Sequence, residues 1–442
     1  MSRQLHKKVF VGMSGGVDSS VAAYLLNKAT PNNFSKLFGR PTPKGFRGYD
    51  VTGVFMKCWN GGPSTELGAE CTWERDSEDV RRVAGKLGIP FYIWDFEEEY
   101  KKKVIEYMVD GYRKGETPNP DVMCNREIKF GLFLKHALEL GADYVATGHY
   151  VRLACRHIST GTGRLFAPAA KSGLDSRFDD SADGGRAHRS SETFRTKHAG
   201  KLSFALLEAK DKNKDQSYFL WTLTQNELRY CLFPIGDYLK SEVRTIARKA
   251  DLPTATKKDS QGICFLGQVS LTDFLKGYLP EKRGLVVSIT GEKLGEHMGA
   301  QFYTIGQRHG LDLKEKNTAL RISGEHITQP HYVTEKNIKT NTLTVAEGDK
   351  NPALFKKKIT LRDVSFVDMS HSNVLKNIRM SKMRVLARVR YRQPVSSATL
   401  IRDKRGAYKL FFDSPQKFVA PGQSAVFYNL HGKMLGGGVI QC

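Results

Sequence analysis

Long apolar runs are missing from this chain of 442 residues. No stretch of about 18 uncharged apolar residues occurs, so we expect no transmembrane helix and no membrane partner. Residues 1–8 are basic and lack an apolar core, which argues against a secretory signal. The sequence also has no internal repeat. Because one hydrophobic core cannot serve a chain of this length, two or three domains are expected.

Cysteine is scarce and scattered. The cysteines are Cys58, Cys71, Cys124, Cys155, Cys231, Cys264 and Cys442. No two are spaced as Cys-x-x-Cys, and none lies in a cluster with histidine, so we expect no bound zinc and no iron–sulfur cluster. An odd, scattered set also argues against a secreted disulfide scaffold and favours a reducing compartment.

Acidic residues are outnumbered. Asp and Glu total 46 against 69 Lys and Arg, so the formal net charge is +23. Such an excess favours a polyanionic partner, and nucleic acid is the first candidate. The alternative is a basic surface that serves only solubility.

The first third of the chain alternates between strand and helix patterns. Short apolar strands are predicted at 9–11, 51–56, 91–94 and 144–147, and helices at 21–27, 79–87, 97–111 and 128–140. This alternation predicts a doubly wound parallel sheet of the α/β class, in which ligands bind beyond the carboxyl ends of the strands.

Two polar stretches interrupt the pattern, and the later chain differs. Residues 30–49 predict a surface loop, and residues 155–203 predict a disordered insertion because they cannot bury enough apolar surface. Residues 225–276 are mostly helical in pattern. Short β runs then follow at 343–345, 385–391, 398–401, 409–412 and 425–428, which predict a small antiparallel barrel. The expected domains are 1–223, 224–330 and 331–442.

A glycine-rich turn follows the first strand and opens a helix. It contains Gly12, Met13, Ser14, Gly15, Gly16, Val17, Asp18 and Ser19. Glycines let the backbone approach an anion, and N–H groups at the helix start can hold phosphate. The turn is neither a Walker loop nor a dinucleotide-binding loop. It resembles the PP-loop of the ATP pyrophosphatases, which cleave ATP to AMP and pyrophosphate, with Asp18 placed to hold Mg²⁺ or position the phosphates. A chance glycine-rich turn is the alternative.

Two cysteines lie in distinctive surroundings. Two prolines and two asparagines predict a rigid, non-helical loop over 117–125, with Cys124 near the start of the following helix, where thiolate is favoured. Asp121 is a candidate general acid or base. Cys264 has lysines before it, which also favour thiolate. For each cysteine the alternative is an inert, buried thiol.

The chain resembles the tRNA-specific 2-thiouridylases across nearly its whole length. The matching stretches are 12–20, 117–130 (TPNPDVMCNREIKF), 146–150 (ATGHY), 214–220 (KDQSYFL), 258–265 (KDSQGICF), 303–311 (YTIGQRHGL), 421–428 (PGQSAVFY) and 435–440 (LGGGVI). The stretch 71–76 looks more like the eukaryotic mitochondrial branch, which implies a mitochondrial location. The insertion at 155–203 and a lengthened stretch at 312–329 depart from the bacterial pattern.

The resemblance implies a role for each matching residue. Cys124 corresponds to the nucleophile, Cys264 to the carrier of a persulfide, and Met56 and Gly148 to further ATP contacts. Asn119, Pro120 and Asp121 correspond to the segment that meets the target base. Further tRNA contacts are implied for His149, Lys214, Asp215, Gln216, Arg390, Tyr391 and Gln423.

The implied reaction is ATP-dependent 2-thiolation of the wobble uridine of tRNA. ATP with Mg²⁺ would adenylate the C2 oxygen, and the persulfide would then supply sulfur and leave a Cys124–Cys264 disulfide. The implied partners are tRNA, a cysteine desulfurase or sulfur-relay protein as donor, and a thiol reductant. The alternatives are another PP-loop enzyme that adenylates tRNA or forms an amide, and a non-catalytic RNA-binding protein with a decayed nucleotide loop.

Overall fold

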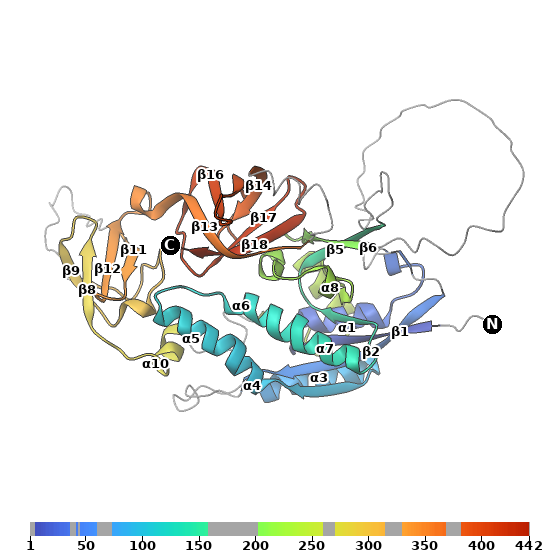
Figure 1. Ribbon diagram of the computed structural model, residues 1–442. Helices are drawn as coiled ribbons and strands as arrows, with labels where there is room; N and C mark the ends of the chain where they lie inside the picture. Colours follow the sequence, from blue (N-terminus) through green and yellow to red (C-terminus); the bar gives the residue numbers. More distant parts are fainter. Residues whose placement is uncertain are drawn as a thin grey trace, which may run out of the picture.

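The computed structural model describes residues 5–35, 41–42, 45–59, 73–157, 202–259, 270–313, 329–367 and 382–441. Strands within these ranges form a parallel sheet, a second sheet, a closed barrel and a two-stranded hairpin. In Figure 1 the parallel sheet and its helices lie below the barrel, and the second sheet lies at the end of the molecule away from the N-terminus.

The first sheet has the order β3-β2-β1-β4-β7, and each neighbouring pair is parallel. Its strands are β1 (Leu5–Met13), β2 (Phe46–Lys57), β3 (Phe91–Asp95), β4 (Tyr144–Thr147) and β7 (Cys231–Leu232). Strand β1 is buried on both faces, because Phe10 packs in one core cluster while Val9 and Val11 pack in another. A strand of this kind needs helices on both faces, and the predicted doubly wound α/β fold is confirmed.

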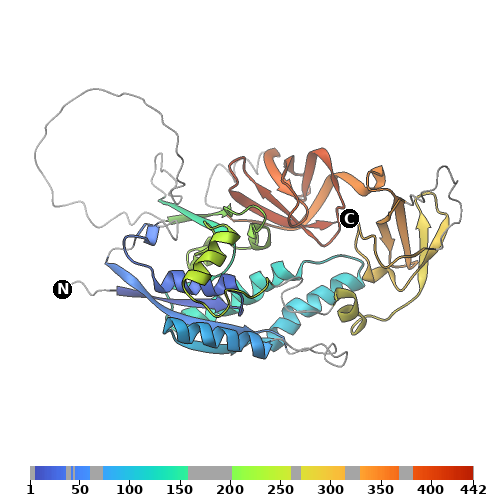
Figure 2. The ribbon, with the colours of Figure 1, turned by 180° about the vertical axis from the view of Figure 1, so that it is seen from behind.

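Helices cover the two faces of this sheet (Figures 1 and 2). On one face lie α1 (Val17–Asn27), α3 (Trp73–Leu87) and α9 (Lys240–Lys249). On the other lie two long helices, each interrupted by a π-helical stretch. They consist of α4 (Glu97–Tyr100), η2 (Lys101–Ile105) and α5 (Glu106–Arg113), and of α6 (Pro120–Met123), η3 (Cys124–Leu132) and α7 (Phe133–Glu139).

The second long helix begins earlier than predicted. Residues 117–125 were expected to be non-helical throughout, but α6 starts at Pro120. Proline suits the first helical position because its missing N–H would have no partner there. The Oδ1 atom of Asn119 accepts a hydrogen bond from the N–H of Val122 at 3.3 Å, which caps the helix.

The two polar interruptions are shorter than expected. Strand β2 already begins at Phe46, whose ring packs 4.6 Å from Phe34 and 5.0 Å from Tyr49 between centroids, so this aromatic cluster is core and not surface loop. Both ends of the predicted insertion are also strand, because β5 (Val151–His157) pairs antiparallel with β6 (Leu202–Glu208). The rest of the predicted insertion, 158–201, lies outside the described residues.

The second sheet has the order β10-β9-β8-β12-β11. It contains β8 (Gly284–Ser288), β9 (Lys293–His297), β10 (Asp312–Leu313), β11 (His331–Asn337) and β12 (Thr342–Glu347), next to η5 (Ala300–Phe302). The run 343–345 was predicted to belong to the barrel, but it lies in β12 and pairs with β8 and β11. Alternating apolar residues indicate a half-buried strand without indicating which sheet it joins.

The barrel closes in the order β13-β16-β15-β14-β17-β18, which confirms the predicted antiparallel barrel. Its elements are η6 (Pro352–Leu354), β13 (Phe355–Phe366), β14 (Lys382–Arg388), β15 (Ser396–Arg402), β16 (Tyr408–Lys417), β17 (Ser424–Tyr428) and β18 (Met434–Gln441). Its core holds alternate strand residues such as Leu400, Leu410 and Phe427.

Connecting segments join the sheets and tie the barrel to the first domain. They include η4 (Ser217–Leu220), α8 (Gln225–Leu228) and α10 (Leu271–Lys276). Buried bonds at η4 run from Tyr218 Oη to Ser424 O at 2.9 Å and from Trp221 Nε1 to Ser424 Oγ at 3.0 Å. Strand β7 follows residue 223 yet joins the first sheet, and β11 follows residue 330 yet joins the second. The domain boundaries at 223 and 330 stay predictions. Across the described ranges no helix is both long and apolar enough to cross a membrane.

Candidate functional site

The glycine-rich turn between β1 and α1 has a defined internal geometry. Gly15 has a φ of +71°, and a Cβ there would lie 2.6 Å from the carbonyl oxygen of Asp76, so glycine is required. Ser19 Oγ accepts a hydrogen bond from the N–H of Ser14 at 3.2 Å and donates to Gly16 O at 3.1 Å. Gly16 precedes α1 without any side-chain cap, which leaves the helix start open to an anion.

Residues from neighbouring strands close around this phosphate loop, residues 12–19. A Cβ on Gly12 would lie 3.0 Å from Met56 Cε at the end of β2. A Cβ on Gly148, just beyond β4, would lie 2.6 Å from the backbone nitrogen of Ser19. Met56 and Gly148 therefore lie against the phosphate loop, at the carboxyl end of the sheet where ligands of such folds bind. The side chains of Met13 and Val17 are buried in the core, so only their backbone can face a nucleotide.

Asp18, the second residue of α1, lies in a charged contact that sequence reasoning missed. Its carboxylate accepts a hydrogen bond from Tyr150 Oη at 2.8 Å and from Lys240 Nζ at 2.8 and 2.9 Å. Burial and then the charge of Asp18 raise the pKa of the Tyr150 hydroxyl far above its ordinary value, so Tyr150 remains a donor. Tyr150 belongs to the ATGHY motif, whereas no motif marked Lys240.

Asp259 extends this contact toward the segment before Cys264. Its carboxylate meets Lys240 Nζ at 2.8 Å, Lys214 Nζ at 2.8 Å and Arg244 Nη2 at 2.6 Å. Burial opposes the ionisation of Asp259, but hydrogen bonds from Lys214 and Lys240 and their charges outweigh it and hold the pKa well below its usual range. We call Asp18, Lys214, Lys240, Arg244 and Asp259 the charge cluster.

The segment 257–259 is held from a second side. Lys257 Nζ pairs with Asp76 Oδ1 at 2.7 Å and with Asp79 Oδ2 at 2.6 Å, both in α3. Asp76 is the residue whose backbone lies against Gly15. Lys257 is therefore connected to the phosphate loop through α3, and Asp259 is connected to it through Lys240 and Asp18.

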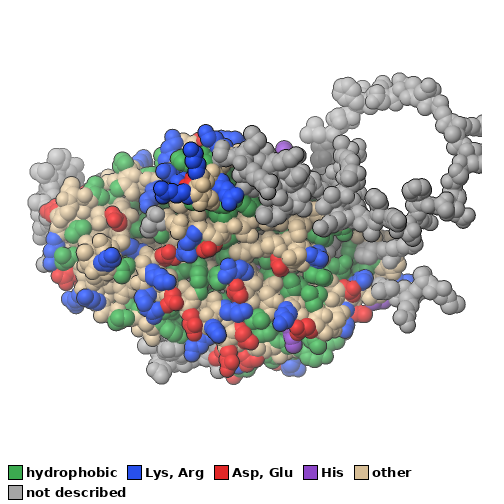
Figure 3. Space-filling view, viewed as in Figure 1, with side chains coloured by type: hydrophobic (Ala, Val, Ile, Leu, Met, Phe, Trp, Pro, Cys, Tyr) green, Lys and Arg blue, Asp and Glu red, His purple; other side chains and the backbone are tan. Residues whose placement is uncertain are grey.

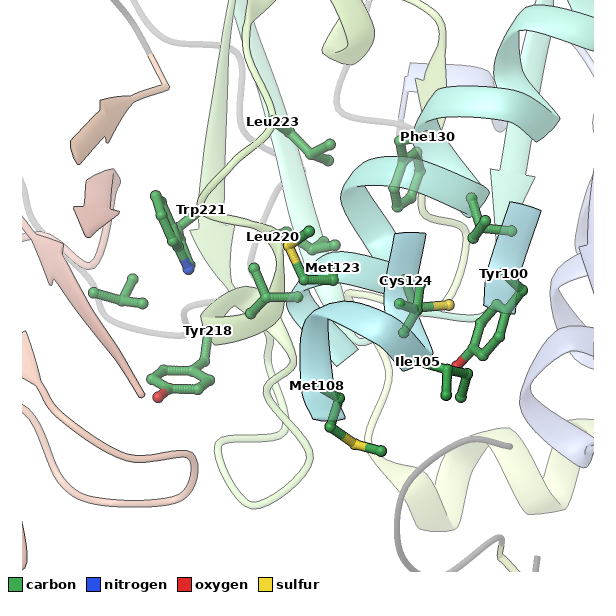
Figure 4. Close-up of a cluster of buried hydrophobic side chains, with 14 of the residues drawn as sticks. Tyr100, Ile105, Met108, Met123, Cys124, Phe130, Tyr218, Leu220, Trp221 and Leu223 are labelled. Carbon is green, nitrogen blue, oxygen red and sulfur yellow. The ribbon is translucent and has the colours of Figure 1, made fainter. Parts of the chain in front are cut away.

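Cys124 is buried in the adjoining core. It is 4% exposed, and its N–H bonds to Pro120 O, so it lies just beyond the first turn of the helix, where the helix dipole acts less strongly than at the start. Figure 4 shows it among buried apolar side chains that include Tyr100, Ile105 and Met108. Cys264 lies outside the described residues, so an approach of the two cysteines stays a prediction.

The loop before Cys124 is held by both other sheets. The N–H of Thr117 donates to Pro421 O at 2.7 Å, and Gln423 Nε2 donates to Thr117 O at 2.9 Å and Pro118 O at 3.3 Å. Lys336 Nζ, from β11, donates to the carbonyl of Glu116 at 3.3 Å. These bonds fix the chain entering α6 and the neighbouring residues 119–121.

The residues predicted to meet the target base lie at this helix start. Asn119 and Pro120 are buried, whereas the side chain of Asp121 is half-buried. Only Asp121 therefore keeps a partly exposed side chain in this conformation.

The predicted tRNA contacts fall into two groups by burial. Asp215 is 2% exposed, its oxygens accept bonds from Ala209 N and Ser217, and burial raises its pKa. His149 is 7% exposed with its ring nitrogen 2.8 Å from Thr147 Oγ1. In this conformation both side chains are buried and form hydrogen bonds inside the protein.

The other predicted contacts are half-buried. Gln216 Oε1 accepts the N–H of Tyr150 at 2.9 Å, and Arg390 Nη2 donates to Ile305 O at 2.7 Å. Tyr391 packs against Phe219 with 4.5 Å between ring centroids. The roles implied for all of these residues in tRNA binding stay predictions.

The phosphate loop has the features of a nucleotide site. Gly15 and Gly148 let the backbone of α3 and the chain after β4 pack closely around the loop, while the start of α1 carries no side-chain cap and stays open to a phosphate. Among the residues that the structure describes, no group of three or more His, Cys, Asp or Glu side chains could hold a metal ion. Asp18 is the carboxylate that a nucleotide-bound Mg²⁺ would meet.

Comparisons with known proteins cover nearly the whole chain. Residues 7–38 and 45–268 match the family described as tRNA methyl transferase HUP domain. Residues 272–347 match the tRNA methyl transferase PRC-barrel domain, and residues 356–440 match the aminomethyltransferase beta-barrel domain.

Two bacterial proteins are similar over their full length. The chain is 39% identical over 422 residues to the tRNA-specific 2-thiouridylase MnmA of Alkaliphilus oremlandii (strain OhILAs), an alignment that covers 96% of this chain and 94% of that protein. It is 40% identical over 433 residues to MnmA of Bacillus subtilis (strain 168), covering 98% and 94%. Among solved structures, the U34-tRNA thiolase NcsA from Methanococcus maripaludis with its [4Fe-4S] cluster has a TM-score of 0.30 at 15% identity, covering 62% of this chain and 68% of that one, a likeness too low to carry an argument.

Proposed function

We propose that this chain, which belongs to the tRNA-specific 2-thiouridylase family and is a tRNA sulfurtransferase, uses ATP to place sulfur at C2 of the wobble uridine. The observation that carries this proposal is the intact phosphate loop with Met56 and Gly148 against it. The start of α1 in this loop has no side-chain cap, so its N–H groups stay available to a phosphate, as a working nucleotide loop requires.

The ATP step makes the uridine reactive. A C2 carbonyl oxygen is a poor leaving group, but attack of this oxygen on the α-phosphorus of ATP breaks the α–β bond and releases pyrophosphate. The resulting adenylate leaves readily as AMP. The open start of α1 and the loop N–H groups stabilise the phosphates. Asp18 would hold a Mg²⁺ ion bound with ATP, which would supply charge neutralisation for the departing pyrophosphate.

The sulfur step uses the two cysteines. The terminal sulfur of a persulfide on Cys264 attacks C2 and expels AMP, which joins the uridine to Cys264 through a disulfide bond. The thiolate of Cys124 then attacks the Cys264 sulfur, so that the sulfur stays on C2 and a Cys124–Cys264 disulfide forms. A thiol reductant must supply two electrons before the next cycle, and a cysteine desulfurase or relay protein must reload Cys264.

Burial of Cys124 protects its thiol in the proposed reaction. Because its side chain is 4% exposed, Cys124 is shielded from solvent oxidants until the substrate base enters. The target base must leave the anticodon stack to reach the site, as single-stranded bases do in many RNA-binding proteins.

The test is thiolation of unmodified tRNA by the purified protein with ATP, Mg²⁺ and a persulfide donor. Nucleoside mass spectrometry should detect 2-thiouridine, and both Cys124→Ser and Cys264→Ser should abolish it. Cys231→Ser is the matched control, because Cys231 lies in β7 and its thiol bonds to Glu227 O. Release of AMP without any thiolated uridine from the wild-type protein would sink the proposal.

A mitochondrial location is a further part of the proposal. It rests on the likeness of residues 71–76 to the eukaryotic mitochondrial branch. A fusion of the full chain to a fluorescent protein should co-localise with a mitochondrial marker, and a diffuse signal would contradict it.

A further inference from the structure

Lys240 is placed to do more than pair with one carboxylate. It is the first residue of α9, and α9 packs on α1, whose start is the phosphate site. Its side chain is 13% exposed, and Nζ lies within 2.9 Å of Asp18 and 2.8 Å of Asp259. Holding a long, charged side chain there costs conformational entropy and desolvation, so the position calls for a function.

The negative charge of Asp18 must be neutralised before a triphosphate can bind beside it, and Lys240 supplies the opposite charge. A carboxylate on the second residue of α1 repels a triphosphate that approaches the same helix start. In this structure the ammonium of Lys240 neutralises that carboxylate. An ammonium has three N–H donors, so Lys240 can keep its bond to Asp259 and donate to a phosphate when a nucleotide-bound cation occupies Asp18.

Through Asp259, Lys240 also contacts the segment 254–259. The segment 254–259 is tied to the two helices beside the phosphate loop: Thr254 Oγ1 donates to Ser20 Oγ of α1 at 2.9 Å, and Arg244 Nη1 of α9 donates to Lys257 O at 3.1 Å. Lys240 is the residue that touches both Asp18 on the loop and Asp259 on this segment. If the ammonium moves from Asp18 toward a phosphate and keeps its bond to Asp259, then Asp259 and its segment must move with it.

We propose that Lys240 is a phosphate-binding residue for ATP, and that its bond to Asp259 couples nucleotide occupancy to the position of residues 254–259. This inference rests on the proposed use of ATP. It adds to the ATP site a binding residue, Lys240, that lies outside every motif of the chain. Coupling of this kind is reciprocal: the factor by which bound nucleotide shifts the equilibrium position of residues 254–259 is the factor by which that position changes nucleotide affinity.

The first experiment measures affinity for α,β-methylene ATP, which cannot be cleaved between the α and β phosphorus, by titration calorimetry with Mg²⁺. Lys240→Met should weaken binding by roughly tenfold or more, equivalent to about 1.4 kcal/mol. Lys249→Met is the matched control, because it removes the same charge from an exposed position of the same helix. Wild-type affinity in Lys240→Met would overturn the proposal.

Folding of the variant is checked independently. Thermal unfolding should show Lys240→Met to be folded, and Lys240→Arg, which keeps the charge, should recover part of the affinity. If Lys240→Met and Lys240→Arg lose affinity equally while both are folded, charge is not what the site uses and the proposal fails.

The second experiment measures hydrogen exchange in peptides covering residues 254–259, with and without the same analogue. In the wild-type protein the analogue should change their exchange, and in Asp259→Asn with analogue bound the change should be lost. An unaltered response in Asp259→Asn would overturn the coupling. If the wild-type protein binds the analogue but makes no 2-thiouridine, the proposed function fails while the role of Lys240 stands.

Discussion

At the scale of single residues, Gly148 shows most directly how the backbone excludes side chains around the phosphate loop. A Cβ at Gly148 would lie 2.6 Å from Ser19 N and 2.8 Å from Asp18 C, both rigid backbone atoms. We therefore expect Gly148→Ala to displace the start of α1 and to lower affinity for an ATP analogue by roughly tenfold or more, about 1.4 kcal/mol. Titration calorimetry with Mg²⁺ measures this loss.

The matched control is Gly85→Ala. Gly85 is an exposed residue of α3, and a Cβ there would have no atom within 4 Å, so alanine should leave nucleotide affinity unchanged. Alanine there should even stabilise the helix by about 0.5–1 kcal/mol. Both variants should bind tRNA as the wild-type protein does, and equal nucleotide affinities in the two would contradict the assigned loop geometry.

His149 gives a prediction of pH dependence. Burial, followed by the nearby charge of Lys129, holds the pKa of His149 well below its ordinary value of 6.5. Below pH 6.5 the unfolded chain therefore takes up a proton that the folded protein refuses. The stability contribution is complete above pH 6.5 and is lost as pH falls toward the folded pKa, by at most about 1.4 kcal/mol per pH unit.

Thermal unfolding between pH 7.5 and 5.5 tests this expectation, with both limits chosen to bracket the ordinary histidine pKa. His149→Gln should flatten the fall in melting temperature on acidification, whereas His431→Gln, at an exposed position, should not. A wild-type profile that matches that of His149→Gln would show that His149 is protonated in the folded protein.

At the scale of elements, the loop entering α6 depends on a contact from the barrel. Gln423 precedes β17 and donates to the carbonyls of Thr117 and Pro118. We expect Gln423→Ala to slow thiolation at saturating tRNA by up to about tenfold, because each lost hydrogen bond contributes about 0.5–1.5 kcal/mol to holding the loop. Single-turnover rates measure the effect on thiolation, and filter binding measures any separate effect on tRNA affinity.

The control for this element is Gln393→Ala, which removes an amide that bonds to Gln416 within the barrel. It should change neither rate nor affinity. The resemblance implies instead that Gln423 contacts tRNA. An unchanged saturating rate with weaker tRNA binding in Gln423→Ala would support that role and contradict the positioning role.

Elements were predictable from sequence where local pattern decides them. Strand β1 is buried on both faces and gives a continuous apolar run, and its alternation with the predicted helices and the other apolar runs already indicated the α/β fold. The strand at 343–345 was recognised but placed in the wrong sheet, because alternation does not specify a partner. The loop residues 12–19 were found because phosphate binding requires glycine at fixed spacing.

Contacts between distant positions were not predictable. Lys240 lies 222 positions from Asp18, and Gln423 lies 306 positions from Thr117. Neither residue has a local signature for its partner, since any lysine at a helix start or glutamine near a strand looks the same in sequence. The burial of Asp215 is likewise set by β6 and the barrel and not by its own motif.

At the scale of the whole molecule, the loop at residues 116–118 of the first domain contacts both the second sheet and the barrel. Glu116 pairs with Arg362 of β13 and accepts a hydrogen bond from Lys336 of β11. The N–H of Thr117 donates to Pro421 O, and the carbonyl of Thr117 accepts a hydrogen bond from Gln423. The residues that lead to Cys124 are therefore held by the second sheet and the barrel as well as by their own domain.

The basic charge is the last whole-molecule property, and it is gathered in part on the barrel. Lys356, Lys357 and Lys358 are exposed at the start of β13, and Figure 3 shows Lys and Arg side chains clustered over the barrel. We expect tRNA affinity to fall steeply with salt, because each neutralised phosphate releases counterions. Replacing all three lysines with glutamine should reduce the slope of log affinity against log salt by about 2, at about 0.7–0.9 per lost contact. Removing equal charge from Arg81, Arg82 and Lys86 of α3 is the control, and a slope that falls equally in both variants would show that the barrel is not a preferred tRNA surface.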